Sequence, residues 1–124
     1  MTESTYQYAH VITWDDLPGD QPMEKITRKR IIGVNMMLSH VFLEKDFAVE
    51  EHAHANEQFA IVVSGKVAFG INGKGTDRFQ KVTLSAGQVL VIPPNCPHSA
   101  HALEDTLIID CFSPPSDTTG VDHG

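Results

Sequence analysis

Two histidines two residues apart, with a glutamine four residues later, are the residues whose types and spacing first suggest chemistry. They are His52, His54 and Gln58 in the segment EEHAHANEQFAIVVSG, residues 50–65. Because side chains alternate between the faces of a strand, the two histidines project together, as does Gln58 if the register holds. Glu57 then faces away unless a bulge reverses it. The spacing suggests a metal site; alone, such a pair also fits a solvated strand face.

A second segment, GQVLVIPPNCPH at residues 87–98, offers a further imidazole. Pro93 and Pro94 fix φ and make the approach to the turn rigid. Asn95 is one of the few non-glycine residue types that tolerate a left-handed backbone. We therefore expect this turn to aim His98 at a defined point.

The elements that must position these residues are short strands. Apolar or alternating runs occupy residues 31–43, 46–54, 58–63, 66–71, 78–84, 88–92 and 106–112. Asn72-Gly73 is a strong hairpin signal, since both residues tolerate positive φ. No stretch keeps a 3.6-residue period over three turns, and strands recurring at this spacing predict a sandwich or barrel.

The 124 residues are expected to form one domain with three parts. Residues 1–30 are predicted to be an N-terminal arm with one strand, YAHVITW at residues 8–14, anchored by Tyr6, Tyr8 and Trp14. Residues 31–113 are predicted to be the barrel. Residues 114–124 are polar and predicted to be a loose C-terminal tail.

The charge and the apolar pattern exclude several classes of partner. A formal charge of -7 argues against nonspecific binding to nucleic acid or to an anionic membrane. No segment approaches the roughly 20 apolar residues that span a bilayer, and no signal peptide is recognisable. Two cysteines, Cys96 and Cys111, do not make a disulfide framework. The sequence therefore predicts a soluble, cytoplasmic protein that binds neither nucleic acid nor membrane.

Together the two segments resemble the motifs of the cupin family. The first motif, G-x5-H-x-H-x3,4-E-x6-G, is matched at His52, His54, Gln58 and Gly65, with Asp46 at the first glycine and glutamine in place of glutamate. The second, G-x5-P-x-G-x2-H-x3-N, is matched at Gly87, Pro93 and His98, with Asn95 and Ala102 in place of glycine and asparagine. The resemblance covers residues 31–112.

This resemblance implies a fold and a metal. The fold is an all-β cupin jelly-roll barrel. The metal is one divalent transition ion, Zn, Fe, Ni or Cu, held by His52, His54, Gln58 and His98 near the barrel centre. A neutral glutamine leaves the full charge on the ion, which makes it a stronger Lewis acid. The resemblance also implies a homodimer.

Further candidate residues lie on the strands that flank these motifs. Asp110 and Phe112 share parity with Ile108, so all three face inward if Ile108 does. An inward carboxylate is costly unless it is paired or functional; the alternative is a solvated aspartate at the barrel mouth. His40 shares parity with Leu38 and is a candidate only if that face points inward.

The NEQ form of the first motif, with D-x-F-x-P at Asp110, Phe112 and Pro114, is similar to a cupin subgroup from pectin degradation. That subgroup converts unsaturated monouronates to linear ketonised sugars, and its closing aspartate and phenylalanine line the site. An arginine commonly follows that proline by two residues, but Ser116 stands here, and no lysine or arginine follows Lys81. In the subgroup that arginine could hold a substrate carboxylate. The basic run of Arg28, Lys29 and Arg30 could substitute for it if the N-terminal arm folds over the barrel mouth; the alternative is a solvated strand edge.

Three functions fit these residues. The first is a metal-dependent isomerase, tautomerase or lyase acting on a sugar-acid or keto compound, with Asp110 moving the proton. The second is a non-haem iron dioxygenase, because three histidines and a weak glutamine ligand leave positions open. The third is a small-ligand-binding module without catalysis. A shared fold does not separate them.

Overall fold

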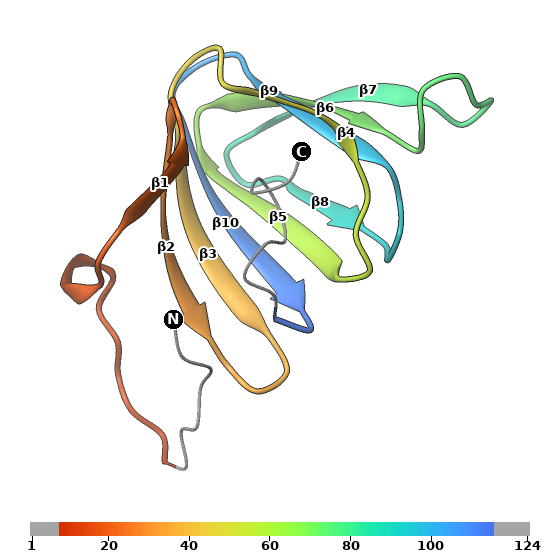
Figure 1. Ribbon diagram of the computed structural model, residues 1–124. Helices are drawn as coiled ribbons and strands as arrows, with labels where there is room; N and C mark the ends of the chain where they lie inside the picture. Colours follow the sequence, from red (N-terminus) through yellow and green to blue (C-terminus); the bar gives the residue numbers. More distant parts are fainter. Residues whose placement is uncertain (1–7, 116–124) are drawn as a thin grey trace.

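The computed structural model describes residues 8–115 of the chain, and these fold into two antiparallel sheets packed face to face (Figure 1). The larger sheet contains β1 (Asp20–Met23), β2 (Ile26–Ile32), β3 (Met37–Leu43), β10 (Thr106–Ser113), β5 (Glu57–Ser64) and β8 (Val89–Ile92), in that order. The smaller sheet contains β4 (Ala48–His52), β9 (His98–Ala102), β6 (Lys66–Ile71) and β7 (Gln80–Ser85), in that order. The predicted all-β jelly roll is confirmed.

Helical structure within residues 8–115 is limited to one short 3-10 turn, η1 (Trp14–Asp16). No helix in this part of the chain is long and apolar enough to cross a membrane. The larger sheet has two more strands than the smaller one, and Figure 1 shows that its β1–β3 side extends beyond the smaller sheet. Most inward side chains of β2 and β3 are nevertheless buried, including Ile26, Val41 and Leu43.

Strict alternation along the strands builds the core. In β3, Met37, Ser39, Val41 and Leu43 are buried, and the residues between them lie on the other face. Each inward side chain then packs against inward side chains of the facing sheet, as a period of two requires. The main apolar cluster between the sheets consists of Ile26, Val41, Leu43, Phe47, Val49, Ala60, Val62, Val67, Phe69, Leu84, Ala102 and Ile108.

The predicted turn at Asn72-Gly73 is present, with φ of 70° and 95° at the two residues. The chain does not reverse there at once, because the ladder between β6 and β7 starts at the pair Ile71 and Gln80. Thr76 holds the intervening loop by placing its hydroxyl 3.0 Å from the Asn72 carbonyl oxygen and 2.8 Å from that of Gly73. The asparagine-glycine pair therefore opens a long loop and does not form a two-residue hairpin.

Positive φ explains three positions of the two motifs. Asp46 and Asn95, which stand where the cupin motifs have glycine, have φ of 74° and 62°. Aspartate and asparagine tolerate this region better than other side chains, so the turns survive both replacements. Gly65 has φ of 91°, and a Cβ there would collide with the backbone of Asp105 and Thr106. Glycine is required at residue 65 by both conformation and space.

The N-terminal arm differs from the prediction. The described part of the expected strand at residues 8–14 lies in no sheet, and Tyr8 and Val11 are 83% and 92% exposed. Alternating side chains alone do not make a strand, because the backbone N–H and C=O groups also need a neighbouring strand to pair with. The chain first pairs in the sheet at β1 and β2. Strand β2 also crosses the boundary expected after residue 30. Tyr6 and residues 116–124 of the expected tail lie outside the described residues.

Candidate metal centre

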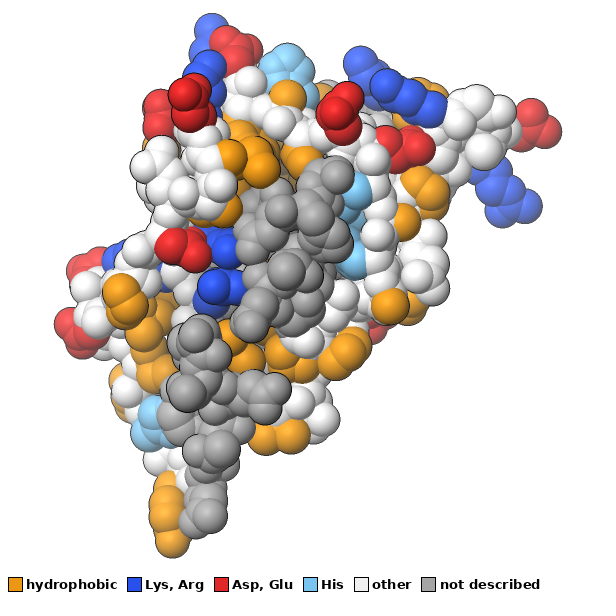
Figure 2. Space-filling view, viewed as in Figure 1, with side chains coloured by type: hydrophobic (Ala, Val, Ile, Leu, Met, Phe, Trp, Pro, Cys, Tyr) orange, Lys and Arg blue, Asp and Glu red, His pale blue; other side chains and the backbone are white. Residues whose placement is uncertain are grey.

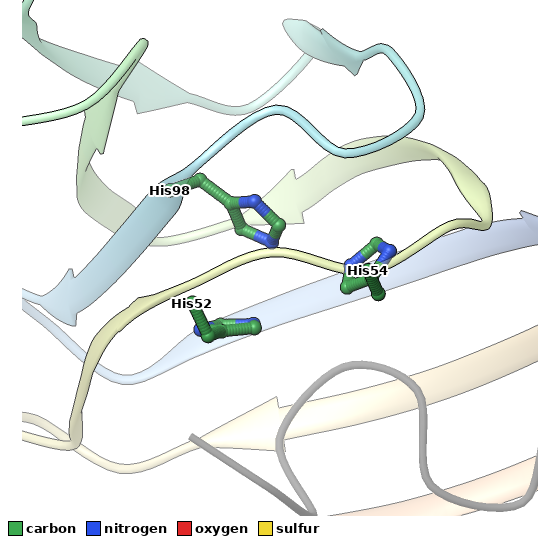
Figure 3. A group of neighbouring side chains, drawn as sticks. All are labelled: His52, His54 and His98. Atoms are coloured by element: carbon green, nitrogen blue, oxygen red, sulfur yellow. The ribbon is translucent and has the colours of Figure 1, made fainter.

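Three histidines converge between the two sheets (Figure 3). One nitrogen from each of His52, His54 and His98 lies within 4.8 Å of the others. The ring centres of His52 and His98 are 4.4 Å apart, and those of His54 and His98 are 4.9 Å apart. His54 and His98 are buried and His52 is half-buried. The predicted convergence of both sequence motifs on one point is therefore present.

Three different pieces of backbone bring these rings together. His52 ends β4 and pairs with His98, which begins β9. His54 lies in the turn that carries the chain from the smaller sheet to the larger one. The backbone N–H of Asn95 donates to the His54 carbonyl oxygen at 2.7 Å, which ties the second motif directly to the first. This bond fixes the turn that precedes His98.

Each imidazole is oriented by a backbone carbonyl. The Nδ1 atoms of His52, His54 and His98 each lie 2.9 Å from a carbonyl oxygen, belonging to Glu50, Asn56 and Cys96 respectively. A carbonyl oxygen only accepts, so Nδ1 carries the proton in each ring and Nε2 is left with its lone pair. Carbonyl contacts of this kind typically hold metal-binding histidines in position.

The electrostatics of the cluster also suit a metal ion. The pKa of His98 is lowered from 6.5 to about 4, mainly by burial and also by the nearby His52 and His54. The hydrogen bond to the Cys96 carbonyl and the charge of Glu51 act in the opposite direction. His98 is therefore neutral at pH 7, as a ligand must be. Nε2 of His52 is buried without a hydrogen-bond partner among the described residues. A buried unpaired acceptor is costly, and a metal ion would remove that cost.

Gln58 stands beside this cluster as a fourth polar group. It is 5% exposed and Glu57 is exposed, so Gln58 faces inward and Glu57 outward as predicted. The continuous strand assumed in that prediction is absent, because β4 ends at His52 and β5 begins at Glu57. Gln58 Oε1 lies 3.1 Å from Nε2 of His54. Because His54 donates from Nδ1, its Nε2 carries a lone pair, as does Oε1 of Gln58. A cation would stabilise two acceptors that lie this close together. The residues present therefore fit a bound divalent ion.

Asp110 is linked to the cluster through the other end of the same amide. Gln58 Nε2 donates to Asp110 Oδ1 at 2.9 Å, which fixes the orientation of the amide. Burial raises the pKa of the Asp110 carboxyl from 3.8 to about 7, and the hydrogen bond from Gln58 acts in the opposite direction. The half-buried carboxyl can therefore exchange a proton near neutral pH.

Phe112 forms an apolar wall of the site. It is 2% exposed, and its ring stands edge-on to that of His54 with the centres 5.9 Å apart. Ile108, Asp110 and Phe112 all turn to the inner face of β10, as their shared parity predicts. The alternative of an aspartate projecting into solvent does not hold, because Asp110 lines a cavity inside the barrel.

That cavity, of about 50 Å³, lies between the sheets next to the histidines. It has room for a few water molecules. Four polar side chains, those of His52, His98, Gln58 and Asp110, reach it, and the rest of the lining is apolar: Val41, Leu43, Phe47, Val49, Phe69, Ala100 and Ile108. The polar groups thus meet at one end of an otherwise apolar space.

His40 is the one predicted site residue that the structure does not bring to the cluster. Ser39 and Val41 on either side of it are buried in the core, so His40 faces the outer side of β3. Its ring packs there against Trp14, with the centres 4.9 Å apart. Parity grouped His40 with Leu38 correctly, but which face is inward depends on the position of the second sheet.

The basic run at residues 28–30 divides between the two faces of β2. Arg28 is buried and Arg30 is half-buried, and both lie on the inner face together with the buried Ile26 and Ile32. Lys29 lies on the outer face and donates from Nζ to the Trp14 carbonyl oxygen at 3.0 Å. The sequence allows either a role in the pocket or a solvated strand edge for these residues. Their alternation with isoleucine was the signal for an inward position.

Comparison with known families now identifies the chain. Residues 39–110, more than half of its length, match the model of the cupin domain. The chain belongs to the cupin family. This cupin carries the three histidines and Gln58 within the matched region, and Asp110 at its end. No protein of curated function matches its sequence.

Solved structures agree with this assignment. This cupin is similar to KdgF from a Halomonas species, at 27% identity and a TM-score of 0.79, over 91% of this chain and all of that one. It is also similar to an RmlC-like cupin from Shewanella frigidimarina, at 21% identity and a TM-score of 0.79, over 91% and 97% of the two chains. Oxalate decarboxylase from Bacillus subtilis shares the fold, at 18% identity and a TM-score of 0.75, over 90% of this chain and 32% of that one.

Proposed function

We propose that this cupin is a metal-dependent enzyme that isomerises, tautomerises or cleaves a small sugar-acid or keto compound. His52, His54 and His98 would hold one divalent transition ion, with Oε1 of Gln58 as the fourth protein ligand. When bound, the ion would supply Lewis-acid polarisation of a substrate carbonyl or hydroxyl oxygen. Two likenesses support this proposal. The sequence motifs resemble those of cupins that ketonise unsaturated uronates, and the structure is similar to that of KdgF.

The observation that carries the proposal is the contact between Asp110 and Gln58. One amide faces His54 with its oxygen and Asp110 with its nitrogen, at 3.1 Å and 2.9 Å. A carboxyl that exchanges a proton near pH 7 therefore lies one side chain away from the ligand cluster. Isomerisation and tautomerisation need a group that removes a proton from one atom and returns it to another.

Each neighbouring residue has a defined part in this mechanism. Asp110 takes the proton from carbon next to the carbonyl group and returns it at the new position. Gln58 keeps the accepting oxygen of Asp110 in place through its Nε2 hydrogen bond. Phe112 and the apolar cavity lining limit access of water, which strengthens the electrostatic interactions inside.

Metal analysis of natively purified protein is the first test. We expect about one equivalent of transition metal in the wild type and strong loss in a His52→Ala/His98→Ala variant. Equal metal content in the two proteins would refute the metal site. A screen of unsaturated uronates and 1,3-dicarbonyl compounds then follows with the metal-loaded protein. Asp110→Asn should keep the metal and lose turnover; unchanged turnover would remove Asp110 from the mechanism.

A non-haem iron dioxygenase is the second candidate, and the cavity is the observation that favours it. Apolar side chains make up most of its lining, and a small apolar space beside three imidazoles suits dioxygen. Oxygen uptake that depends on Fe(II) and is absent with Zn(II) would support this function. Native zinc or nickel would count against it.

We further propose that a second copy of the chain covers the outer face of the larger sheet. A solvated sheet face is normally polar, but this one carries adjacent apolar side chains on β10, β5 and β8. Those of Phe59, Val63, Val89 and Val91 are 41%, 44%, 49% and 55% exposed. The pairs Phe59 with Val91 and Ile61 with Val89 are directly opposite in the ladder, so the apolar surface is continuous. Such a surface is typical of a subunit interface.

A further inference from the structure

Two arginines on the inner face of β2 are not used by the proposed chemistry. The side chain of Arg28 is 6% exposed and that of Arg30 is 16% exposed. Arginine is rarely this buried, because removing a guanidinium from water is costly unless it is paired or functional. Ile26 and Ile32 occupy the same face, so apolar residues are accepted in this row. Two charges there need a reason.

Strand register places both arginines on the side of the metal cluster. Arg30 pairs with Ser39 on β3, and Ser39 pairs in turn with Asp110 on β10. Strands in a sheet are about 4.8 Å apart, so the backbones of Arg30 and Asp110 are about 10 Å apart with only a small serine side chain between them. In the neighbouring row, Arg28 pairs with Val41, which lines the cavity.

Figure 2 shows the same relation at the surface. Lys and Arg side chains gather next to acidic ones over the β1–β3 side of the larger sheet. His side chains, in pale blue, are visible on the same face of the molecule. Basic side chains and histidine are therefore both visible from one side of the molecule.

The two guanidinium groups already hold a carboxylate. Asp20 on β1 accepts from Arg28 Nε at 3.0 Å and from Arg28 Nη2 at 3.3 Å. Nη2 of Arg30 lies 3.6 Å from the same aspartate. The two-pronged contact with Arg28 is the geometry in which arginine recognises a planar carboxylate. Asp20 itself is 46% exposed, so its carboxylate is accessible to exchange with solvent and ligands.

We propose that Arg28 and Arg30 form a subsite that binds the carboxylate of the substrate, and that Asp20 is the internal carboxylate it displaces. The inference rests on the proposed function and deepens it, since it assigns an acid as the substrate class. The acid group would be held over β2 while the reacting end of the molecule lies at Asp110 and the histidines. The geometry favours carboxylate over phosphate, because a carboxylate already fits.

The test compares an acid with its neutral amide. Binding of D-galacturonate and D-galacturonamide to the zinc-loaded protein is measured by calorimetry, with the zinc content of every variant determined. We expect the wild type to bind the acid more tightly than the amide. In Arg30→Gln the ratio of acid affinity to amide affinity should fall roughly ten- to hundredfold. Arg28→Gln should act in the same direction. Arg78→Gln, on the exposed loop between β6 and β7, is the matched control and should bind as the wild type.

Asp20→Asn gives an independent result that does not depend on how the arginine variants fold. If Asp20 competes with the ligand, its neutralisation should tighten galacturonate binding severalfold and leave the amide unaffected. An unchanged acid-to-amide ratio in both Arg30→Gln and Asp20→Asn would overturn the subsite and leave a structural ion pair. Inorganic phosphate competing as strongly as galacturonate would overturn the preference for carboxylate.

The same experiment separates this inference from the proposed function. Binding is read without turnover, so an acid preference that depends on Arg30 supports the subsite even where no substrate is converted. Conversely, turnover of an acid whose acid-to-amide binding ratio is unchanged in both Arg30→Gln and Asp20→Asn supports the enzyme and refutes the subsite.

Discussion

Replacing Asp110 by asparagine should change how the stability of the metal-free protein depends on pH. The asparagine Oδ1 can still accept the hydrogen bond that Gln58 Nε2 gives to Asp110 at 2.9 Å. The substitution therefore removes the titrating group and keeps its volume and its contact. What is lost is the cost of ionising a buried carboxyl.

The magnitude follows from the pKa of Asp110, which burial raises from 3.8 to about 7. Between these two values the folded protein holds a proton that the unfolded chain has released, so stability falls as pH rises. Each pKa unit corresponds to about 1.36 kcal/mol, which gives at most about 4 kcal/mol across the window. The wild type bears the full cost above about pH 7, and Asp110→Asn does not.

His98 acts in the opposite direction in the same range. Its pKa is lowered from 6.5 to about 4, so the unfolded chain binds the extra proton and stability rises with pH over that interval. The two effects offset each other in the wild type. The difference between the wild type and Asp110→Asn isolates the aspartate, because His98 is common to both proteins.

The assay is urea unfolding in excess chelator at pH 5, 6, 7 and 8. The free energy of unfolding of Asp110→Asn, minus that of the wild type, should increase from pH 5 to pH 7 and level off by pH 8. Asp77→Asn, at an exposed position between β6 and β7, is the control. Adding Zn²⁺ should flatten the difference, since a nearby cation stabilises the carboxylate. A difference that is constant with pH in the metal-free protein would refute the reasoning.

Four further outcomes are expected. Gln58→Glu places a second carboxylate against Asp110 in the metal-free protein and should lower the free energy of unfolding at pH 8 by about 1–3 kcal/mol, measured in urea. Gly65→Ala should lower it by about 2–4 kcal/mol, because φ is 91° and the added methyl meets backbone; an unchanged melting temperature would contradict this. Chelator should lower the melting temperature of the wild type and have little effect on that of His52→Ala. If the free metal concentration had been 100-fold above Kd, the wild type should lose about 2.7 kcal/mol of unfolding free energy. Val91→Lys should convert a dimer to monomers in sedimentation velocity, whereas the same dimer in the variant would exclude this face.

Much of the fold and of the candidate site could be predicted from the order of residues. The residue types and spacing of His52, His54 and Gln58 predicted one site, although they do not share a strand: His52 ends β4, His54 lies in a turn, and Gln58 is on the other sheet. Asn72 and Asn95 marked backbone with positive φ, since few other side chains tolerate it. These are local properties, set by sterics within a few residues.

Other features depended on the tertiary structure. Parity groups residues by face, but only the smaller sheet decides which face is inward, and this is why His40 lies outside the site and Arg30 inside the barrel face. The hydrogen bond between Gln58 and Asp110 joins residues 52 positions apart, which no local pattern encodes. The sequence by itself determined the ligand types and their spacing. Only the packing of two sheets decided that these ligands converge, and that a carboxyl and two arginines lie on the same inner face, because burial and proximity exist only between strands that have already met.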